Sequence, residues 1–304
     1  MKSQKIILSP KILSLILLII LGVVAPSLLL NIKNKYFYSI LSDLAIPQNT
    51  NNTQLLSKSL PNSLSTTKLN NFQPDVKSKV VTLTVPPQFS GAIVYQAKLL
   101  NKEKYIALTF DDGPWLNSTA GILKILHQNN VKGTFFVLGR NIQQYPKLAM
   151  QIVAEGHAIG NHTWHHWYHF LNQQTAAFEI DRTANLISQI TGMSTTLFRP
   201  PGGILSNGPA AYARKKNYTI VMWSDDSQDY RRPSVNTLVN RVLKQAKPGG
   251  IVLMHDGGGN RARTVAALPQ IISQLKQRGY SFVTIPELLE IQSKEQNLQT
   301  SKLN

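Results

Sequence analysis

Two adjacent aspartates, Asp111 and Asp112, stand where a run of strand-like residues ends. The run from Tyr105 to Phe110 has few polar residues, which is typical of a buried strand, and the chain then continues as Asp-Asp-Gly. In α/β barrels, the carboxyl ends of the strands form the rim at which chemistry takes place. The pair is therefore a candidate site, although an Asp-Gly step alone is also typical of a turn.

Histidines are concentrated in one short segment. Four of the seven lie within eight positions, in the string His-Thr-Trp-His-His and three residues further on. A spacing of four places His162 and His166 on one side of a helical turn, so both can reach one ion, and His165 and His169 have the same spacing. With Asp112, two nitrogens and a carboxylate leave positions open for water and substrate. We predict a divalent metal, with zinc first and cobalt or another first-row metal as alternatives.

Three later polar clusters also follow apolar runs. Arg199 opens an Arg-Pro-Pro-Gly-Gly string, in which the guanidinium can keep a neighbouring carboxylate ionised and the prolines stiffen the loop. Asp225, Asp226 and Asp229 form an acidic segment, which alone is typical of a solvated loop. His255 ends another apolar run, and a histidine held protonated by an aspartate can donate a proton.

Short strand-like runs alternate with segments of helical spacing from residue 104 onward. The runs begin near Tyr105, Thr134, His157, Thr196, Thr219, Gly250 and Ser281. About seven strand-then-helix units predict parallel strands covered by helices. We expect an α/β fold, a distorted (β/α)7 TIM-barrel-like domain over residues 104–290. A doubly wound open sheet is the alternative, but no glycine-rich phosphate loop follows the first strand.

The segments that flank this domain have a different composition. Residues 36–79 are rich in Asn, Gln, Ser, Thr, Lys and Pro and too poor in apolar residues to bury a face, so a flexible stalk is predicted. Residues 80–103 contain two short alternating runs, which predict a small β hairpin ahead of the domain. Residues 291–304 are predicted to form a disordered tail.

The amino-terminal residues 1–35 are predicted to anchor the chain in a membrane. Residues 12–30 are almost continuously Leu, Ile and Val, and about 20 apolar residues suffice to cross a bilayer. No convincing cleavage site follows, which favours an uncleaved helix over a signal peptide whose removal would secrete the protein. Lysines before the span slightly outnumber those after it, so we expect a cytoplasmic amino terminus and an extracytoplasmic domain.

Composition excludes some chemistry and some partners. The chain has no cysteine, so it has neither disulfides nor thiolate ligands. Its net charge is +17, but the Lys and Arg residues are scattered and do not form a stripe with aromatic residues, which argues against nucleic acid as a partner. An anionic cell wall or membrane surface is the better match for an anchored basic protein.

In this order and on these predicted strand ends, the five clusters resemble the motifs of polysaccharide deacetylases, the NodB-homology or carbohydrate esterase family 4 domains. The resemblance covers roughly residues 104–290. It implies that Asp111 of the Thr-Phe-Asp-Asp-Gly motif is the catalytic base and that Asp112 is a metal ligand. The His-Ser/Thr-x-x-His motif fits the frame that begins at His162, so the resemblance selects His162 and His166 as the other two ligands.

The remaining motifs supply three further roles. The resemblance implies that Arg199 orients the base, that His255 is the general acid, and that Asp226, which opens the D-x-x-D-W motif, holds His255. It also implies hydrolysis of an N-acetyl group. In that reaction the metal polarises the carbonyl and a water, Asp111 takes the proton of the water, and His255 protonates the departing amine.

Two positions depart from the family pattern. Gly202 stands where an aromatic residue usually follows the proline pair, and Tyr230 stands where a tryptophan usually closes the fourth motif. The first change is expected to open the groove. The second is expected to reshape the pocket for the acetyl methyl group, whose other wall would be Leu253. Both departures bear on substrate preference more than on catalysis.

An extracytoplasmic deacetylase implies a cell-surface polymer as substrate. We expect N-acetylglucosamine units of peptidoglycan, with chitin-like oligomers or an N-acetylated exopolysaccharide as the alternative. An inactive carbohydrate-binding barrel is a further alternative, but the chain retains every catalytic and metal position of the motifs. An amidase for small amides is another, and membrane anchoring argues against it.

Overall fold

The computed structural model describes residues 81–101 and 103–301 of the chain. The anchor predicted at residues 1–35 and the stalk predicted at residues 36–79 lie outside the described residues. Within the described part, no helix is long and apolar enough to span a membrane. The described residues therefore comprise the carboxyl-terminal domain and the short segment that precedes it, from residue 81 onward.

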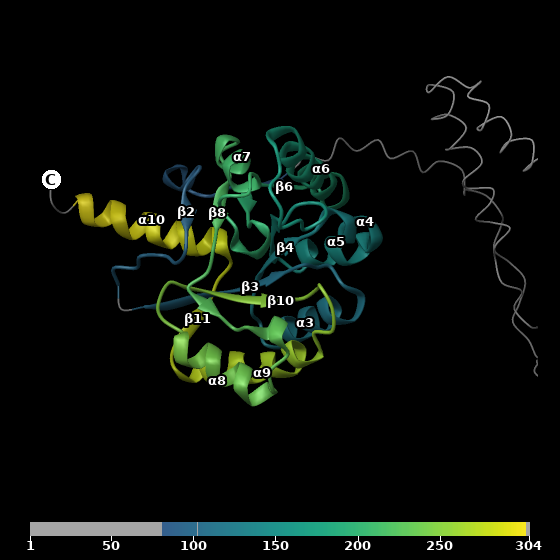
Figure 1. Cartoon of the computed structure of the whole chain (residues 1–304). Helices are drawn as coiled ribbons and strands as arrows, with labels where there is room; N and C mark the ends of the chain where they lie inside the picture. Colours follow the sequence, from purple (N-terminus) through teal and green to yellow (C-terminus); the bar gives the residue numbers. More distant parts are fainter. Residues whose placement is uncertain (1–80, 102, 302–304) are drawn as a thin grey trace, which may run out of the picture. The chain divides into compact units, whose positions relative to one another are not determined.

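A curled, nine-stranded parallel sheet forms the centre of the domain (Figure 1). All its pairings are parallel, as predicted. Within the described residues, the two end strands do not pair with each other, so the TIM-barrel-like prediction is confirmed only in an open form. The strand order is β2 (Ile93–Val94), β8 (Thr219–Val221), β7 (Leu197–Phe198), β5 (Ala158–Asn161), β4 (Thr134–Val137), β3 (Lys104–Asp111), β10 (Gly250–His255) and β9 (Asp225–Asp226), and β11 (Tyr280–Phe282) pairs with β3.

The predicted strand positions are accurate in this domain. Strands β3, β4, β5, β7, β8, β10 and β11 each begin within one residue of the predicted start. They were recognisable because strands covered on both faces form continuous apolar runs. In β4, for example, all four residues of Thr-Phe-Phe-Val are buried.

Helices cover both sides of the sheet. In Figure 1, α8 and α9 lie side by side below β3 and β10, whereas α4, α6 and α7 lie on the upper side. Asn172 and Ser234 cap the first turns of α6 and α8, where their side chains accept hydrogen bonds from backbone N–H groups. The bounds are α3 Leu116–Gln128, α4 Gly139–Gln144, α5 Pro146–Ala154, α6 Gln173–Thr191, α7 Pro209–Lys215, α8 Val235–Gln245, α9 Ala262–Gln277 and α10 Ile285–Ser301.

The alternation of side chains along β3 separates the core from the site. Ile106, Leu108 and Phe110 belong to the main apolar core, together with buried residues of α3, α8 and α9. Successive side chains of a strand point to opposite faces, so Thr109 and Asp111 point to the other face of the sheet. The apolar run that defines this strand therefore also fixes the direction of its terminal carboxylate.

The predicted amino-terminal hairpin is wrong. Strand β1 (Val81–Leu83) pairs in parallel with β6 (Met193–Thr195), and β2 pairs in parallel with β8. Each short run thus adds to the domain separately. Alternation identified both runs as strands but carried no information about their partners, because those partners lie more than 100 residues away in the sequence.

The tail predicted to be disordered is helical as far as Ser301, where the described residues end. Two side chains of α10 bind the segment before β3. Gln292 Oε1 accepts a hydrogen bond from the backbone N–H of Lys98 at 2.9 Å, and Glu295 Oε2 accepts one from Leu100 at 2.5 Å. These contacts satisfy backbone donors that no strand pairs, which explains why polar residues of this helix are buried.

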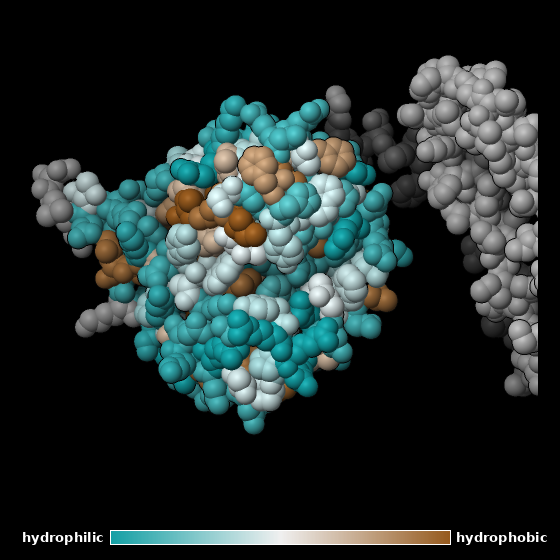
Figure 2. Space-filling model, viewed as in Figure 1, coloured by the Kyte–Doolittle hydropathy of each residue, from teal (hydrophilic) through white to brown (hydrophobic). Residues whose placement is uncertain are grey.

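The surface of the domain is unevenly polar. On the face shown in Figure 2, hydrophobic side chains gather in the upper half, whereas the lower half, over α8 and α9 of Figure 1, is hydrophilic. Exposed aromatic residues include Tyr168, Phe170 and Phe178, which are 58%, 73% and 49% exposed. Aromatic rings available to a ligand are therefore frequent between β5 and the first half of α6.

Candidate active site

Asp111 and Arg199 form a buried ion pair at the carboxyl ends of β3 and β7. Arg199 Nη1 lies 2.7 Å from Asp111 Oδ1, and it also donates to Thr109 Oγ1 at 2.8 Å. The remaining guanidinium nitrogens donate to the backbone carbonyls of Val221 and Met222. A buried charge pair is tolerated only when its hydrogen bonds are satisfied. These contacts therefore fix both the position and the orientation of the Asp111 carboxylate.

Asp112, His162 and His166 converge beside this pair. Their potential ligand atoms all lie within 4.8 Å of one another. Asp112 Oδ1 is 3.1 Å from His166 Nε2 and 3.6 Å from His162 Nε2. Within the described part of the chain, this buried oxygen accepts no hydrogen bond. A buried carboxylate oxygen without a donor is the environment that a bound cation would complete.

His162 has the protonation state that a cation requires. Its Nδ1 lies 2.6 Å from the carbonyl oxygen of Arg199, which can only accept, so Nδ1 carries the proton and Nε2 presents its lone pair toward Asp112. Burial, followed by the charge of His166, lowers the pKa of His162 to about 3. The three residues therefore fit a divalent cation with two nitrogen ligands and one oxygen ligand.

The two imidazoles are brought together by a loop and not by the helical turn that we predicted. Residues 162–172, between β5 and α6, are not helical, and we call them the histidine loop. Thr163 and His166 have positive φ angles of 71° and 66°. The Thr163 N–H donates to Asn161 Oδ1, and Thr163 Oγ1 accepts from the His166 N–H. The threonine of the motif thus stabilises an unfavourable backbone conformation that carries both ligands.

Glu179 of α6 holds the same loop from the other side. Its Oε2 accepts from the N–H groups of Trp164 and His165 at 3.0 and 2.7 Å, and its Oε1 lies 2.5 Å from His165 Nδ1. Its side chain is fully buried. The alternative ligand pair of His165 and His169 is therefore excluded, because His165 faces Glu179. Glu179 lies inside a helix and belongs to no motif, so it could not be recognised from the sequence.

His255 is held by Asp229 and not by Asp226, so our prediction for Asp226 is wrong. His255 Nδ1 lies 2.6 Å from Asp229 Oδ1, and the His255 N–H donates to Asp229 Oδ2 at 2.9 Å. Asp226 Oδ1 instead accepts from the N–H of Gln228, two residues on. The reason is the 3-10 turn η3 (Asp229–Arg231), which follows β9 and carries the second aspartate of the motif back to the end of β10.

Asp229 keeps His255 protonated. Burial lowers the pKa of His255, but the hydrogen bond and charge of Asp229, with the charges of Asp111 and Asp112, outweigh burial and raise it to about 9. Burial raises the pKa of Asp229, and the contacts with His255 and Thr264 reverse this effect and lower it. The pair is therefore an imidazolium and a carboxylate at neutral pH.

One pocket joins these groups. It has a volume of about 420 Å³. Of the ten residues predicted for the site, only Arg199 does not line it, because this side chain lies fully buried. The lining comprises Asp111, Asp112, His162, His166, Tyr168, Gly202, Gly203, Trp223, Asp226, Tyr230, Leu253, His255, Gly258 and Arg261. Four of the lining residues, Tyr168, Trp223, Gly258 and Arg261, belong to no motif that we singled out, and Gly203 lies in the Arg-Pro-Pro-Gly-Gly string but had no predicted role.

Tyr168 fills the space left at Gly202. A Cβ atom at Gly202 would lie 2.9 Å from the Tyr168 ring, and Gly202 has a positive φ of 61° in the 3-10 turn η2 (Pro201–Gly203). The groove is therefore not open at this point, contrary to our expectation. An aromatic ring from the histidine loop occupies the place next to the glycine.

The fold and the site together define a class of protein. A carboxylate oriented by arginine, an imidazolium held by aspartate and a three-residue cation site share one pocket at the carboxyl ends of parallel strands. This combination of base, acid and Lewis-acid site is typical of a hydrolase.

Comparisons with known proteins specify the family. The model of the polysaccharide deacetylase family matches residues 99–221. A peptidoglycan-N-acetylglucosamine deacetylase of Bacillus cereus is 43% identical over 192 residues, which are 62% of this chain and 90% of that protein. This chain belongs to the polysaccharide deacetylase family, and it is a deacetylase that acts by hydrolysis.

Solved structures of the family have the same fold. The Bc1960 peptidoglycan N-acetylglucosamine deacetylase matches with a TM-score of 0.61 and 38% identity, over 65% of this chain and 92% of that chain. BA3943 of Bacillus anthracis, described as a family pseudoenzyme, matches with a TM-score of 0.60 and 30% identity, over 66% of this chain and 69% of that chain. The fold thus occurs in an active enzyme and in a pseudoenzyme. The side chains of the site, and not the fold, therefore determine whether such a domain is active.

Proposed function

We propose that this enzyme removes the N-acetyl group from N-acetylglucosamine units of peptidoglycan. The observation that carries the proposal is the convergence of Asp111, the Asp112–His162–His166 cluster and His255 in one pocket. The similarity to the Bacillus cereus peptidoglycan deacetylase supports the polymer, and the net charge of +17 suits an anionic wall.

Asp112, His162 and His166 would hold a divalent cation, with zinc as the first candidate and cobalt as an alternative. A bound cation supplies a Lewis acid for the acetyl carbonyl and lowers the pKa of a coordinated water, to about 7 for zinc. The residues themselves prepare this site. Neutral His162 presents Nε2, and Asp112 contributes a negative charge that partly balances the cation.

Asp111 is the proposed base. Arg199 occupies its Oδ1, so Oδ2, which lies 3.8 Å from His162 Nε2, faces the cation site. This oxygen can accept a proton from water that attacks the acetyl carbon. The hydrogen bond from Arg199 to the other oxygen holds the carboxylate in the orientation that this step requires.

His255 is the proposed acid. Its Nδ1 is engaged by Asp229, so Nε2 is the nitrogen available to the pocket. When the carbon–nitrogen bond of the acetamide breaks, this group donates its proton to the departing amine, and acetate and a free amine are released. Leu253, Tyr230 and Trp223 line the same pocket and offer an apolar surface to the acetyl methyl group.

The place of action is part of the proposal. The apolar residues 12–30 motivate an amino-terminal membrane anchor with the domain outside the cytoplasm, and secretion after cleavage is the alternative. Fractionation of cells that produce the full chain, with protease added to intact cells, distinguishes a tethered domain from a released one. A domain that resists protease in intact cells would refute both.

Acetate release tests the activity. We expect release from peptidoglycan that exceeds release from chitin oligomers and from an N-acetylated exopolysaccharide, and loss of all release with a chelator. The variant Asp111→Asn should lose about 10²- to 10⁴-fold in turnover while it retains its cation, as measured by elemental analysis. No acetate from any polymer would favour an inactive carbohydrate-binding barrel, and full activity of the variant would refute the assignment of the base.

A further inference from the structure

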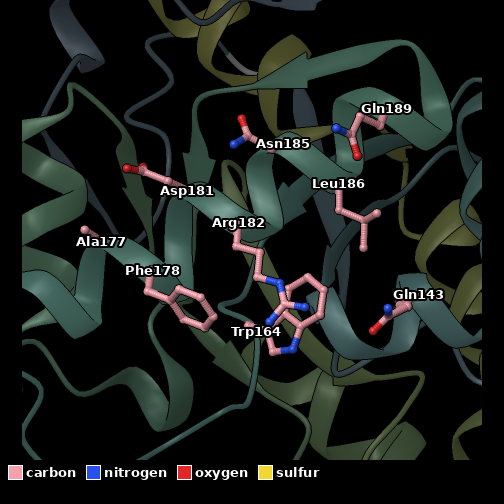
Figure 3. A pocket seen from close by; sticks show the side chains of 9 residues that line it. All are labelled: Gln143, Trp164, Ala177, Phe178, Asp181, Arg182, Asn185, Leu186 and Gln189. Atoms are coloured by element: carbon pink, nitrogen blue, oxygen red, sulfur yellow. The ribbon is translucent and has the colours of Figure 1, made fainter. Parts of the chain in front are cut away.

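A second cavity lies on the other side of the histidine loop, against α4 and α6 (Figure 3). Its volume is about 480 Å³, and it shares no lining residue with the active-site pocket. Trp164 forms one wall, Gln143 of α4 another, and Phe178, Arg182 and Asn185 come from α6. The position matters because Trp164 lies between His162 and His166 in the sequence.

Arg182 is the cationic group of this cavity, whose lining also includes Asp181. Its guanidinium carbon lies 3.6 Å from the centre of the Trp164 ring and 5.2 Å from that of Phe178. Stacking on aromatic rings holds the guanidinium in one plane. Within the described residues, no carboxylate lies within salt-bridge distance of Arg182 and its side chain makes no hydrogen bond. The donors of this guanidinium are therefore oriented and available.

The adjacent acid does not neutralise Arg182. Asp181 accepts a hydrogen bond from the Tyr212 hydroxyl at 2.6 Å and lies 4.0 Å from Lys216 Nζ. Figure 3 shows its carboxylate directed away from the guanidinium. Gln143 and Asn185 also line the cavity and offer amide donors. The cavity therefore combines a guanidinium that makes no ion pair among the described residues, neutral amide donors, and one carboxylate that is directed away from the guanidinium (Figure 3).

We propose that this cavity is a second substrate-binding site, in which Arg182 binds a carboxylate of the wall polymer. A planar guanidinium with free donors matches a carboxylate through two parallel hydrogen bonds, and a neutral sugar would leave the charge unpaired. The inference rests on the proposed function, because peptidoglycan carries carboxylates on its peptide stems and, where a stem is removed, on its lactyl ethers.

Such a site would act by tethering the polymer. A glycan chain held at Arg182 would contact the side of the histidine loop that carries Trp164. The other side of this loop carries the cation ligands His162 and His166. Binding at two points raises the effective concentration of the polymer at the catalytic pocket. The site should therefore lower KM for carboxylate-bearing polymer and leave kcat unchanged, with no effect on short neutral oligomers.

The test compares variants of the full-length protein on modified polymers. Arg182→Gln removes the charge, Arg182→Lys keeps the charge but not the planar fork, and Lys124→Gln removes one charge from the exposed face of α3 as a matched control. Binding is measured by co-sedimentation with insoluble peptidoglycan. The polymer is used untreated, with its carboxylates converted to amides, or freed of stems by an amidase, which separates stem carboxylates from lactyl carboxylates.

We expect Arg182→Gln to weaken binding of untreated peptidoglycan about tenfold, as for the loss of a charge-assisted contact. Arg182→Lys should lose most of this affinity, and Lys124→Gln should bind as the unmodified protein does. Conversion of the carboxylates to amides should weaken the unmodified protein to the level of Arg182→Gln.

Two results would overturn the proposal. One is equal binding by Arg182→Gln and Lys124→Gln. The other is an equal loss of kcat/KM on neutral chitin oligomers and on peptidoglycan, which would mean that Arg182 only supports the histidine loop. Binding that depends on Arg182 without release of acetate from peptidoglycan would support the second site and refute the proposed function alone.

Discussion

Replacement of Asp229 by asparagine should move the pH dependence of the enzyme. Asp229 binds His255 through Nδ1 at 2.6 Å and through the backbone N–H at 2.9 Å. The resulting pKa of about 9 lies about two to three pH units above the ordinary 6.5, which corresponds to about 3 kcal/mol in favour of the protonated imidazole. Asparagine can replace a hydrogen bond but not the charge. In Asp229→Asn, burial should therefore bring the pKa to about 6.5 or below.

The assay is kcat/KM from pH 5 to pH 10. A general acid is active only when it is protonated, so the activity of the unmodified enzyme should fall as the pH rises through about 9. The positive charge of a bound cation would move this fall to a lower pH. At a pKa of 6.5, Asp229→Asn would retain about 3% protonated His255 at pH 8, a loss of about 30-fold, and a lower pKa would enlarge this loss; activity should recover as the pH falls below the new pKa.

The control for this prediction is Asp226→Asn, because Asp226 was the partner expected from the sequence motif. In the structure, Asp226 contacts the N–H of Gln228 and lies 3.4 Å from the Tyr230 hydroxyl. The control should therefore leave the alkaline limb in place. A limb that shifts in Asp226→Asn and stays unchanged in Asp229→Asn would refute the assignment of the acid and its partner.

Three further predictions concern other parts of the domain. Glu179→Ala should weaken cation binding about 10- to 100-fold, measured by competition with a chelator, because Glu179 holds the backbone of the histidine loop between the two histidine ligands. The control Asp181→Ala, two residues further along α6, should leave cation binding unchanged. Burial, and then the charge of Asp226, raise the pKa of Asp225 to about 8, and its two oxygens have no hydrogen-bond donor among the described residues. Relative to the unmodified protein, Asp225→Asn should therefore become more stable as the pH rises from 4 to 8, by up to about 1.4 kcal/mol per pH unit, measured by denaturation curves. Tyr168→Ala should raise KM more than it lowers kcat, and an unchanged KM would show that this ring does not contact the substrate.

The sign of the Asp225 prediction follows from linkage. A carboxyl group whose pKa is raised on folding stabilises the protein below its ordinary pKa of 3.8, and that contribution is lost as the pH rises toward 8. Asparagine does not titrate, so only the unmodified protein loses stability in this range. A difference that stays constant with pH would indicate that Asp225 is ionised in the folded protein.

The sequence predicted the strands and most of the pocket because both depend on local patterns. A strand covered on both faces needs a continuous apolar run, and the first polar residue after the run lies at the rim of the sheet. Asp111 and His255 were found in this way, and the structure places them directly opposite each other in neighbouring strands. The position of Arg199 after β7 follows the same logic.

The errors concern contacts that local patterns do not determine. Asp226 and Asp229 are the same residue type three positions apart, and the backbone after β9, which leads into the 3-10 turn η3, decides which one reaches His255. That turn depends on Gln228 and Arg232, which have positive φ angles of 51° and 53° although neither is glycine. Glu179 and Gln292 lie inside helices, and their partners are backbone N–H groups 14 or more residues away.

The two charge pairs of the pocket explain how one site can hold a base and an acid at the same pH. The proposed base, Asp111, is paired with Arg199, and the proposed acid, His255, would lose its proton on burial alone. Arg199, which follows β7, holds the carboxylate, and Asp229, which follows β9, holds the imidazolium; the two strands are not neighbours in the sheet. Because the two partners are separate, removal of Asp229 should shift the alkaline limb of the pH profile, whereas replacement of Arg199 should lower kcat/KM by releasing the Asp111 carboxylate from its position and should leave this limb in place. A shift of the alkaline limb caused by replacement of Arg199 would be incompatible with this division of roles.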